Sequence, residues 1–201
     1  MTLALILCLT ATVIPVFFSR ISAAPTWLSL QALTLLWITL FDDDGFSLHV
    51  ILAGLEVLLV RALLVPYLLH RALHKNRQAR ISLMPSNLFA WGVAITLIIL
   101  AFKFGDGARG DIRALTLGVA AATAMIAFLI LATNHEPSAQ LVAVLFMENA
   151  LALFESLLPE PWPLPVHLAV SGVYILTVAV GSWLVREDAS ASRDEPSRQV
   201  P

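Results

Sequence analysis

Long apolar runs with almost no charge are the feature that most constrains how this chain can fold. Hydrophobic residues make up 59% of its 201 residues and charged residues 13%, whereas a soluble domain carries about 25% charged residues. A helix that crosses a bilayer needs about 20 apolar residues and satisfies its own backbone hydrogen bonds in lipid. We therefore expect an all-α, polytopic transmembrane helix bundle of about seven spans. The expected spans are Thr2–Phe18, Thr26–Phe41, Phe46–Leu69, Asn87–Phe104, Ile112–Thr133, Ala139–Leu158 and Val166–Val185.

The bundle is expected to form one membrane domain over residues 1–186. We interpret the first run as a retained span rather than a secretion signal, because its first basic residue, Arg20, follows the apolar stretch instead of preceding it. Residues 187–201 are polar, mixed in charge and contain Ser and Pro. Such a composition predicts a disordered C-terminal tail.

Basic residues are distributed unequally between the two sets of span ends. One set holds Arg20, Arg71, Lys75, Arg77, Arg80, Arg186, Arg193 and Arg198, and the other holds Lys103, Arg109 and Arg113 together with the acidic Asp42–Asp44. Lys and Arg accumulate on the cytoplasmic side of membrane proteins. The distribution therefore predicts that the N-terminus lies outside and the C-terminus inside.

Two glutamates in the sixth expected span are candidate proton carriers. An ionised side chain in hydrocarbon costs at least about 2.5–3.5 kcal/mol, so it needs a partner, a proton or a polar cavity. Glu148 lies near the middle of the span and Glu155 follows seven residues later, on almost the same helix face. We favour a proton relay at Glu148. The alternatives are an interhelical structural hydrogen bond for Glu148 and an interfacial position for Glu155.

The third and last expected spans add Glu56, Arg61 and His167. Five residues on an α-helix turn side chains by about 140°, so Glu56 and Arg61 are not expected to pair. Arg61 then needs a partner from another helix or subunit, for which Glu148 is the candidate, unless it reaches the cytoplasmic interface. His167 begins the last span, where a histidine serves either as an interfacial hydrogen-bonding residue or as a proton carrier.

Motifs for catalysis are not found in the sequence. It contains no phosphate-binding glycine loop, no His/Cys cluster at metal-ligand spacing and no nucleophile elbow. We therefore expect no catalytic centre, cofactor or metal site in the chain itself. A net charge of −2 without a basic stripe also argues against nucleic acid as a partner.

Two segments resemble a known family. QLVAVLFMENALALF, residues 140–154, resembles the "sQvigFLvmENgifl" segment of the hydrogenase-4 component E family, and LLVRALLVPYLL, residues 58–69, is similar to a family span in which Lys usually stands at the place of Arg61. That family is the extended relative of complex I subunit K and of the C subunit of multi-subunit cation/proton antiporters. The resemblance implies that residues 112–186 correspond to subunit K and that Glu148 matches its mid-membrane glutamate. In the last span, His167 and Val173 stand where the family carries acidic residues.

The resemblance implies a non-catalytic membrane-arm subunit of a complex-I-like oxidoreductase or group 4 membrane-bound hydrogenase. Such a subunit contributes to proton or sodium translocation coupled to electron transfer, in a bacterial or archaeal cytoplasmic (inner) membrane. Its partners would be the lipid bilayer and other membrane subunits, including antiporter-like ones that belong to the same assembly. The alternatives are a stand-alone small transporter or channel and a purely structural membrane spacer.

The charge distribution predicts opposite sides for two loops. In a Cys8→Ala background, Asp43→Cys should react with a membrane-impermeant maleimide added outside intact cells. Arg77→Cys should react only after the cells are opened, because the basic loop stays in the cytoplasm. Labelling of position 43 only from the cytoplasmic side would contradict the predicted orientation.

Overall fold

The computed structural model describes residues 1–18, 21–41, 48–74, 83, 88–104, 111–158 and 162–194, and within them the chain is helical without any strand. A short 3₁₀ turn, η1, covers Ile21–Ala23. The helices are α1 (Thr2–Phe18), α2 (Ala24–Leu40), α3 (Leu48–Glu56), the π-helix η2 (Val57–Leu64), α4 (Val65–His74), α5 (Leu88–Phe104), α6 (Ile112–Thr133), α7 (Pro137–Glu155) and α8 (Leu164–Asp194).

The expected helical membrane bundle is confirmed. Within the described residues, five segments are long and apolar enough to cross a membrane, namely Ile21–Leu40, Val50–Leu73, Ile112–Thr133, Pro137–Glu155 and Pro165–Glu187. The first and fourth expected spans form helices that are also apolar but shorter, over Thr2–Phe17 and Trp91–Lys103. Acidic Asp42–Asp44 and basic Arg20, Lys75, Arg77, Arg80, Arg109 and Arg198 lie outside the described residues.

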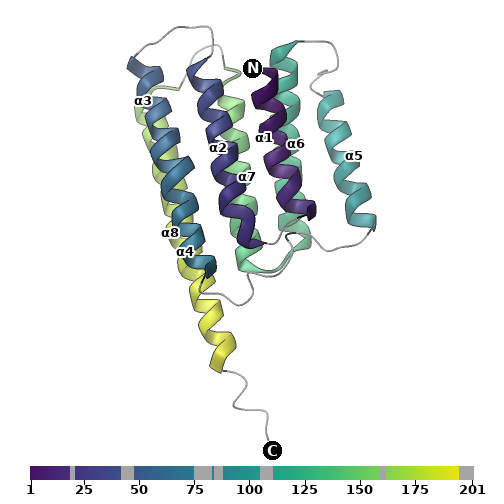
Figure 1. Ribbon diagram of the computed structural model, residues 1–201, viewed down its shortest axis with the longest axis vertical. Helices are drawn as coiled ribbons and strands as arrows, with labels where there is room; N and C mark the ends of the chain where they lie inside the picture. The colour runs from purple at the N-terminus through teal and green to yellow at the C-terminus, as the bar shows by residue number, and fades with distance from the viewer. Residues whose placement is uncertain are drawn as a thin grey trace, which may run out of the picture.

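The helices pack as two rows (Figure 1). One row places α1 beside α2 and α2 beside the rod formed by α3, η2 and α4, while the other places α6 beside α7 and α7 beside α8. The rows meet where α1 packs on α6, α2 on α7, and α4 on α8. Helix α5 packs against α6 at one end of the bundle. Helix α7 is consequently enclosed by neighbours, and more than half of it is buried.

The last helix is longer than the sequence pattern predicts. The prediction of a disordered tail is wrong for residues 187–194, because α8 continues to Asp194 and projects below the other helices in Figure 1. No glycine or proline stands between Gly181 and Pro196, so nothing in the sequence interrupts helical hydrogen bonding there. Residues 195–201 of the predicted tail lie outside the described residues.

A π-helical stretch, η2, lies in the middle of the rod formed by α3, η2 and α4. Residues Val57–Leu64 follow α3 and precede α4 without a break. In a π-helix the backbone hydrogen bonds join residues five apart, and such stretches occur frequently at functional sites. The stretch therefore changes which side chains share a face of the rod.

At Gly181, α8 leaves room for the Leu141 side chain of α7. A Cβ atom at Gly181 would collide with the Leu141 side chain, whereas a Cβ atom at Gly172 on the same helix would meet nothing within 4 Å. Small residues let helix backbones approach in membranes, where van der Waals packing drives association.

Gly181→Leu is expected to lower the stability of the purified chain in detergent by about 1–3 kcal/mol, because the added side chain overpacks the α7–α8 contact. Gly172→Leu is the matched control, with the same gain in helix propensity and open space around it. The check is the midpoint of thermal unfolding of both variants. Equal midpoints would show that the contact does not limit packing.

Candidate functional site

A buried arginine lies at the centre of the bundle. Arg61 sits on η2, and its side chain is 3% exposed. Its Nε lies 3.5 Å from Oε1 of Glu56, and its Nη1 donates to Oδ1 of Asn149 and to the main-chain oxygen of Glu148, both at 3.3 Å. The guanidinium also stacks over Tyr174, 4.6 Å from the ring centroid. One cation is thus held by groups from three helices.

The expectation that Glu56 and Arg61 do not pair is wrong. Their spacing of five residues would separate them on an α-helix, but Glu56 is followed directly by η2, in which hydrogen bonds span five residues. The π-helical winding brings the two side chains onto one side of the rod. The arginine therefore finds an acidic partner within its own helix as well as partners beyond it.

The Glu56 carboxylate connects Arg61 to the last helix. It is 10% exposed, and its Oε1 accepts a hydrogen bond of 2.8 Å from the Ser171 hydroxyl of α8. Its second oxygen, Oε2, lies 3.7 Å from Nε2 of His167, one helical turn before Ser171. The two carboxylate oxygens are therefore turned toward different groups.

His167 links this carboxylate to the end of α7. Its Nδ1 lies 3.3 Å from Oε1 of Glu155, and the two side chains are only 14% and 13% exposed. Both side chains are mostly covered, at the end of α7 and in the first turn of α8. Glu155, His167, Glu56 and Arg61 therefore form a continuous series of ionisable side chains from the end of α7 to the centre of the bundle.

Glu148 lies near Arg61 as expected, but its side chain is not a hydrogen-bond partner of the guanidinium. Its carboxylate is half-buried and interacts with the charge of Arg61, but it accepts no hydrogen bond from the described part of the chain. The hydrogen-bonding side chain that α7 offers to Arg61 is instead that of Asn149, the next residue. Successive helix residues point about 100° apart, and Asn149 is the one that points into the core.

Sequence reasoning missed a chain of neutral polar residues beside the arginine. Asn149 Nδ2 donates to Oε1 of Gln31 at 2.9 Å, and Gln31 Nε2 donates to the Thr12 hydroxyl at 2.9 Å. The Tyr174 hydroxyl donates to Oδ1 of Asn149 at 3.4 Å. All four side chains are buried. An uncharged amide inside an apolar span is costly without partners, so Gln31 could have been flagged from its position alone.

The side chains of this site differ in whether they can carry a proton. A guanidinium stays protonated and donates only, whereas carboxylates and imidazole can accept and release a proton. Amides cannot carry charge, so the Asn149 and Gln31 side chains orient Arg61 without transferring protons. Within the described ranges, no group of three or more His, Cys, Asp or Glu side chains could hold a metal ion.

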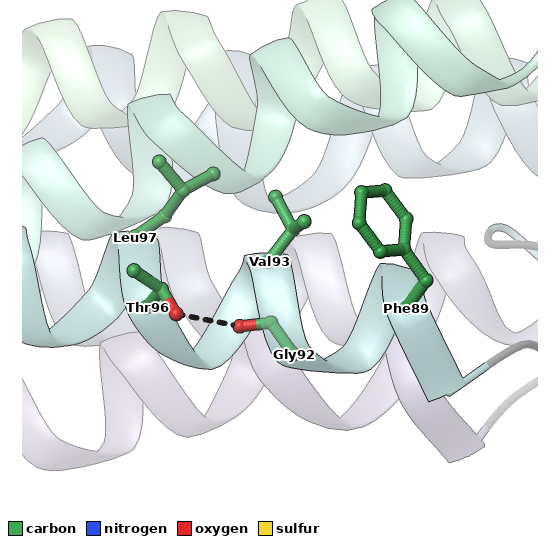
Figure 2. A pocket seen from close by; sticks show the side chains of 5 residues that line it. All are labelled: Phe89, Gly92, Val93, Thr96 and Leu97. Atoms are coloured by element: carbon green, nitrogen blue, oxygen red, sulfur yellow. Dashed lines mark hydrogen bonds between the residues drawn. The ribbon is translucent and has the colours of Figure 1, made fainter.

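A shallow pocket on α5 offers no comparable chemistry (Figure 2). It has a volume of about 390 Å³ and is lined by Phe89, Gly92, Val93, Thr96 and Leu97. The Thr96 hydroxyl donates to the main-chain oxygen of Gly92 at 2.8 Å. The remaining lining is apolar, as expected of a helix surface that meets lipid.

Comparisons with protein-family models, curated proteins and solved structures find no match to this chain. The similarity of residues 140–154 and 58–69 to the hydrogenase-4 component E family therefore stays a hypothesis. The site itself is defined by the contacts of its side chains.

Arg61→Met should destabilise the purified chain by about 3–5 kcal/mol, because the buried Glu56 carboxylate loses its positive partner. Adding Glu56→Gln should restore part of the loss, since the double variant no longer buries an unpaired charge. Arg113→Met, at an exposed position on α6, is the matched control and should be close to neutral. Thermal unfolding in detergent is measured for the wild type, Arg61→Met, Glu56→Gln, the double variant and the control, and additive losses in the double variant would contradict the pairing.

Proposed function

We propose that this chain is a non-catalytic membrane-arm subunit of a complex-I-like oxidoreductase or group 4 membrane-bound hydrogenase, and that it contributes to ion translocation coupled to electron transfer. The observation that carries the proposal is the series Glu155, His167, Glu56 and Arg61 inside an apolar bundle, with Glu148 beside its inner end. Ionisable residues within membrane spans are costly and mark ion or proton pathways.

The permanent charge of Arg61 gives the two inner carboxylates a way to influence each other. Glu56 lies against the guanidinium, and Glu148 interacts with the same charge. When Glu56 takes up a proton, Glu148 becomes the main counter-charge of Arg61, and its ionised form is favoured. Protonation of Glu56 thus promotes deprotonation of Glu148. In this way a change of charge on one side of Arg61 affects the carboxylate on the other side.

The proposal includes seven spans with the N-terminus outside and the C-terminus inside. The α1 and α5 helices have 17 residues each, which corresponds to about 26 Å at 1.5 Å per residue. That length is close to the hydrocarbon thickness of about 30 Å, and a local thinning of the bilayer accommodates the difference. In this orientation, Glu155 and His167 lie toward the outer side, and the extension of α8 lies in the cytoplasm.

The proposal includes partner subunits. Because the sequence carries no cofactor-binding motif, the proposal assigns electron transfer to other members of the assembly, and antiporter-like subunits would continue the ion path. A subunit of this kind should copurify with other membrane proteins after mild solubilisation. A stand-alone transporter would instead purify alone or as a homo-oligomer, and that result would count against the proposal.

Glu148→Gln should leave the assembly intact but abolish or strongly slow ion pumping, because glutamine keeps the shape and cannot carry a proton. Glu155→Gln should be milder, since its position near the end of α7 lets water replace it. Glu136→Gln, at the other end of α7, is the matched control and should pump normally. The measurement is pumping by vesicles that hold the whole complex, alongside its redox rate. A wild-type pumping ratio in Glu148→Gln would identify a structural glutamate.

A further inference from the structure

The imidazole of His167 stands between two carboxylates and presents one nitrogen to each. Nδ1 lies 3.3 Å from Oε1 of Glu155, and Nε2 lies 3.7 Å from Oε2 of Glu56. The two glutamates come from different helices, α7 and α3, so the ring is the group that joins them. A histidine that merely filled a helix end would need only one such partner.

We propose that His167 passes protons between Glu155 and Glu56, one carboxylate at each ring nitrogen, so that the ion handled at this end of the bundle is H⁺ and not Na⁺. The inference rests on the proposed function and specifies its ion and its entry step. Hard cations select oxygen ligands, whereas here an imidazole separates the two carboxylates. Imidazole is the side chain suited to accept a proton at one nitrogen and release another.

The transfer balances with one proton in and one proton out. Protonated Glu155 gives its proton to Nδ1 of a neutral imidazole that carries its own proton on Nε2. Nε2 then gives that proton to the ionised Glu56 carboxylate, and the contact of 3.7 Å shortens as it does so, since such contacts tighten when the reaction proceeds. Water removes the proton left on Nδ1 and supplies one to Nε2, which restores the starting tautomer.

The surroundings of the ring keep Glu56 in the ionised form that the transfer needs as its acceptor. Among the described residues, the charged groups that face the ring include Glu155 of α7, Glu56 of α3 and, beyond Glu56, Arg61 of η2. The Ser171 hydroxyl, one turn along α8, lies 2.8 Å from Oε1 of Glu56 and 3.0 Å from the main-chain oxygen of His167. It fixes the carboxylate so that Oε2 stays turned toward the ring.

The test compares His167→Ala and His167→Gln in vesicles that hold the whole complex. Glutamine can keep a hydrogen bond but cannot relay a proton. Both variants should slow proton pumping by about 10²-fold, the contribution of a positioned proton carrier, and added imidazole should restore much of the rate in His167→Ala. His135, exposed between α6 and α7, provides the control His135→Ala, which should pump normally and ignore imidazole. Replacing Na⁺ by K⁺ should leave wild-type pumping unchanged.

A second measurement separates this inference from the proposed function. Infrared difference spectra of the purified full chain in liposomes, recorded across a pH titration, should show carboxyl and imidazole bands that change together, and His167→Gln should uncouple them. Three results would each overturn the proton shuttle: normal pumping in His167→Gln, a loss in His167→Ala that imidazole does not repair, or a requirement for Na⁺. None of them would contradict the proposed function of the chain as a subunit that couples ion translocation to electron transfer. Coupled infrared bands in a chain that purifies alone would support the shuttle and overturn the proposed assembly.

Discussion

The charge of Arg61 cannot be removed by deprotonation, because a guanidinium stays protonated at any pH that the protein meets. Burying it in an apolar bundle is therefore possible only if other groups compensate it. Glu56, Asn149, Tyr174 and a main-chain oxygen do so from three helices. The register of η2 against α7 and α8 is constrained by these contacts, since a shift by one residue would leave the cation without partners.

Two kinds of polar connection extend from this arginine. On one side, the Glu56 carboxylate leads to His167 and Glu155, which can exchange protons. On the other, Asn149 leads to Gln31 and Thr12, which cannot. The neutral branch fixes geometry deep in the bundle, and the ionisable branch leads toward the end of α7. Arg61 therefore has uncharged hydrogen-bonding residues on one side and titratable residues on the other.

The π-helical winding of η2, within the rod formed by α3, η2 and α4, decides how the site is assembled. An α-helix through Glu56 and Arg61 would turn their side chains apart, and each would need a separate partner elsewhere. The π-helical segment Val57–Leu64 brings them together within one helix. The guanidinium then has one acidic neighbour fixed in its own rod, while its other donors remain available for α7.

The sequence by itself predicted a helical membrane bundle and the approximate positions of its helices, and it singled out five candidate residues, because apolar length and the cost of buried charge are local properties. It did not reveal the π-helix, since no residue type encodes that winding, and so it separated Glu56 from Arg61. Nor could it tell that Asn149 rather than Glu148 would hydrogen-bond the guanidinium through its side chain, because that depends on how α7 is rotated against η2. The meeting of Glu155, His167 and Glu56 was likewise decided only by tertiary packing, which brings α7, α8 and α3 together at one point.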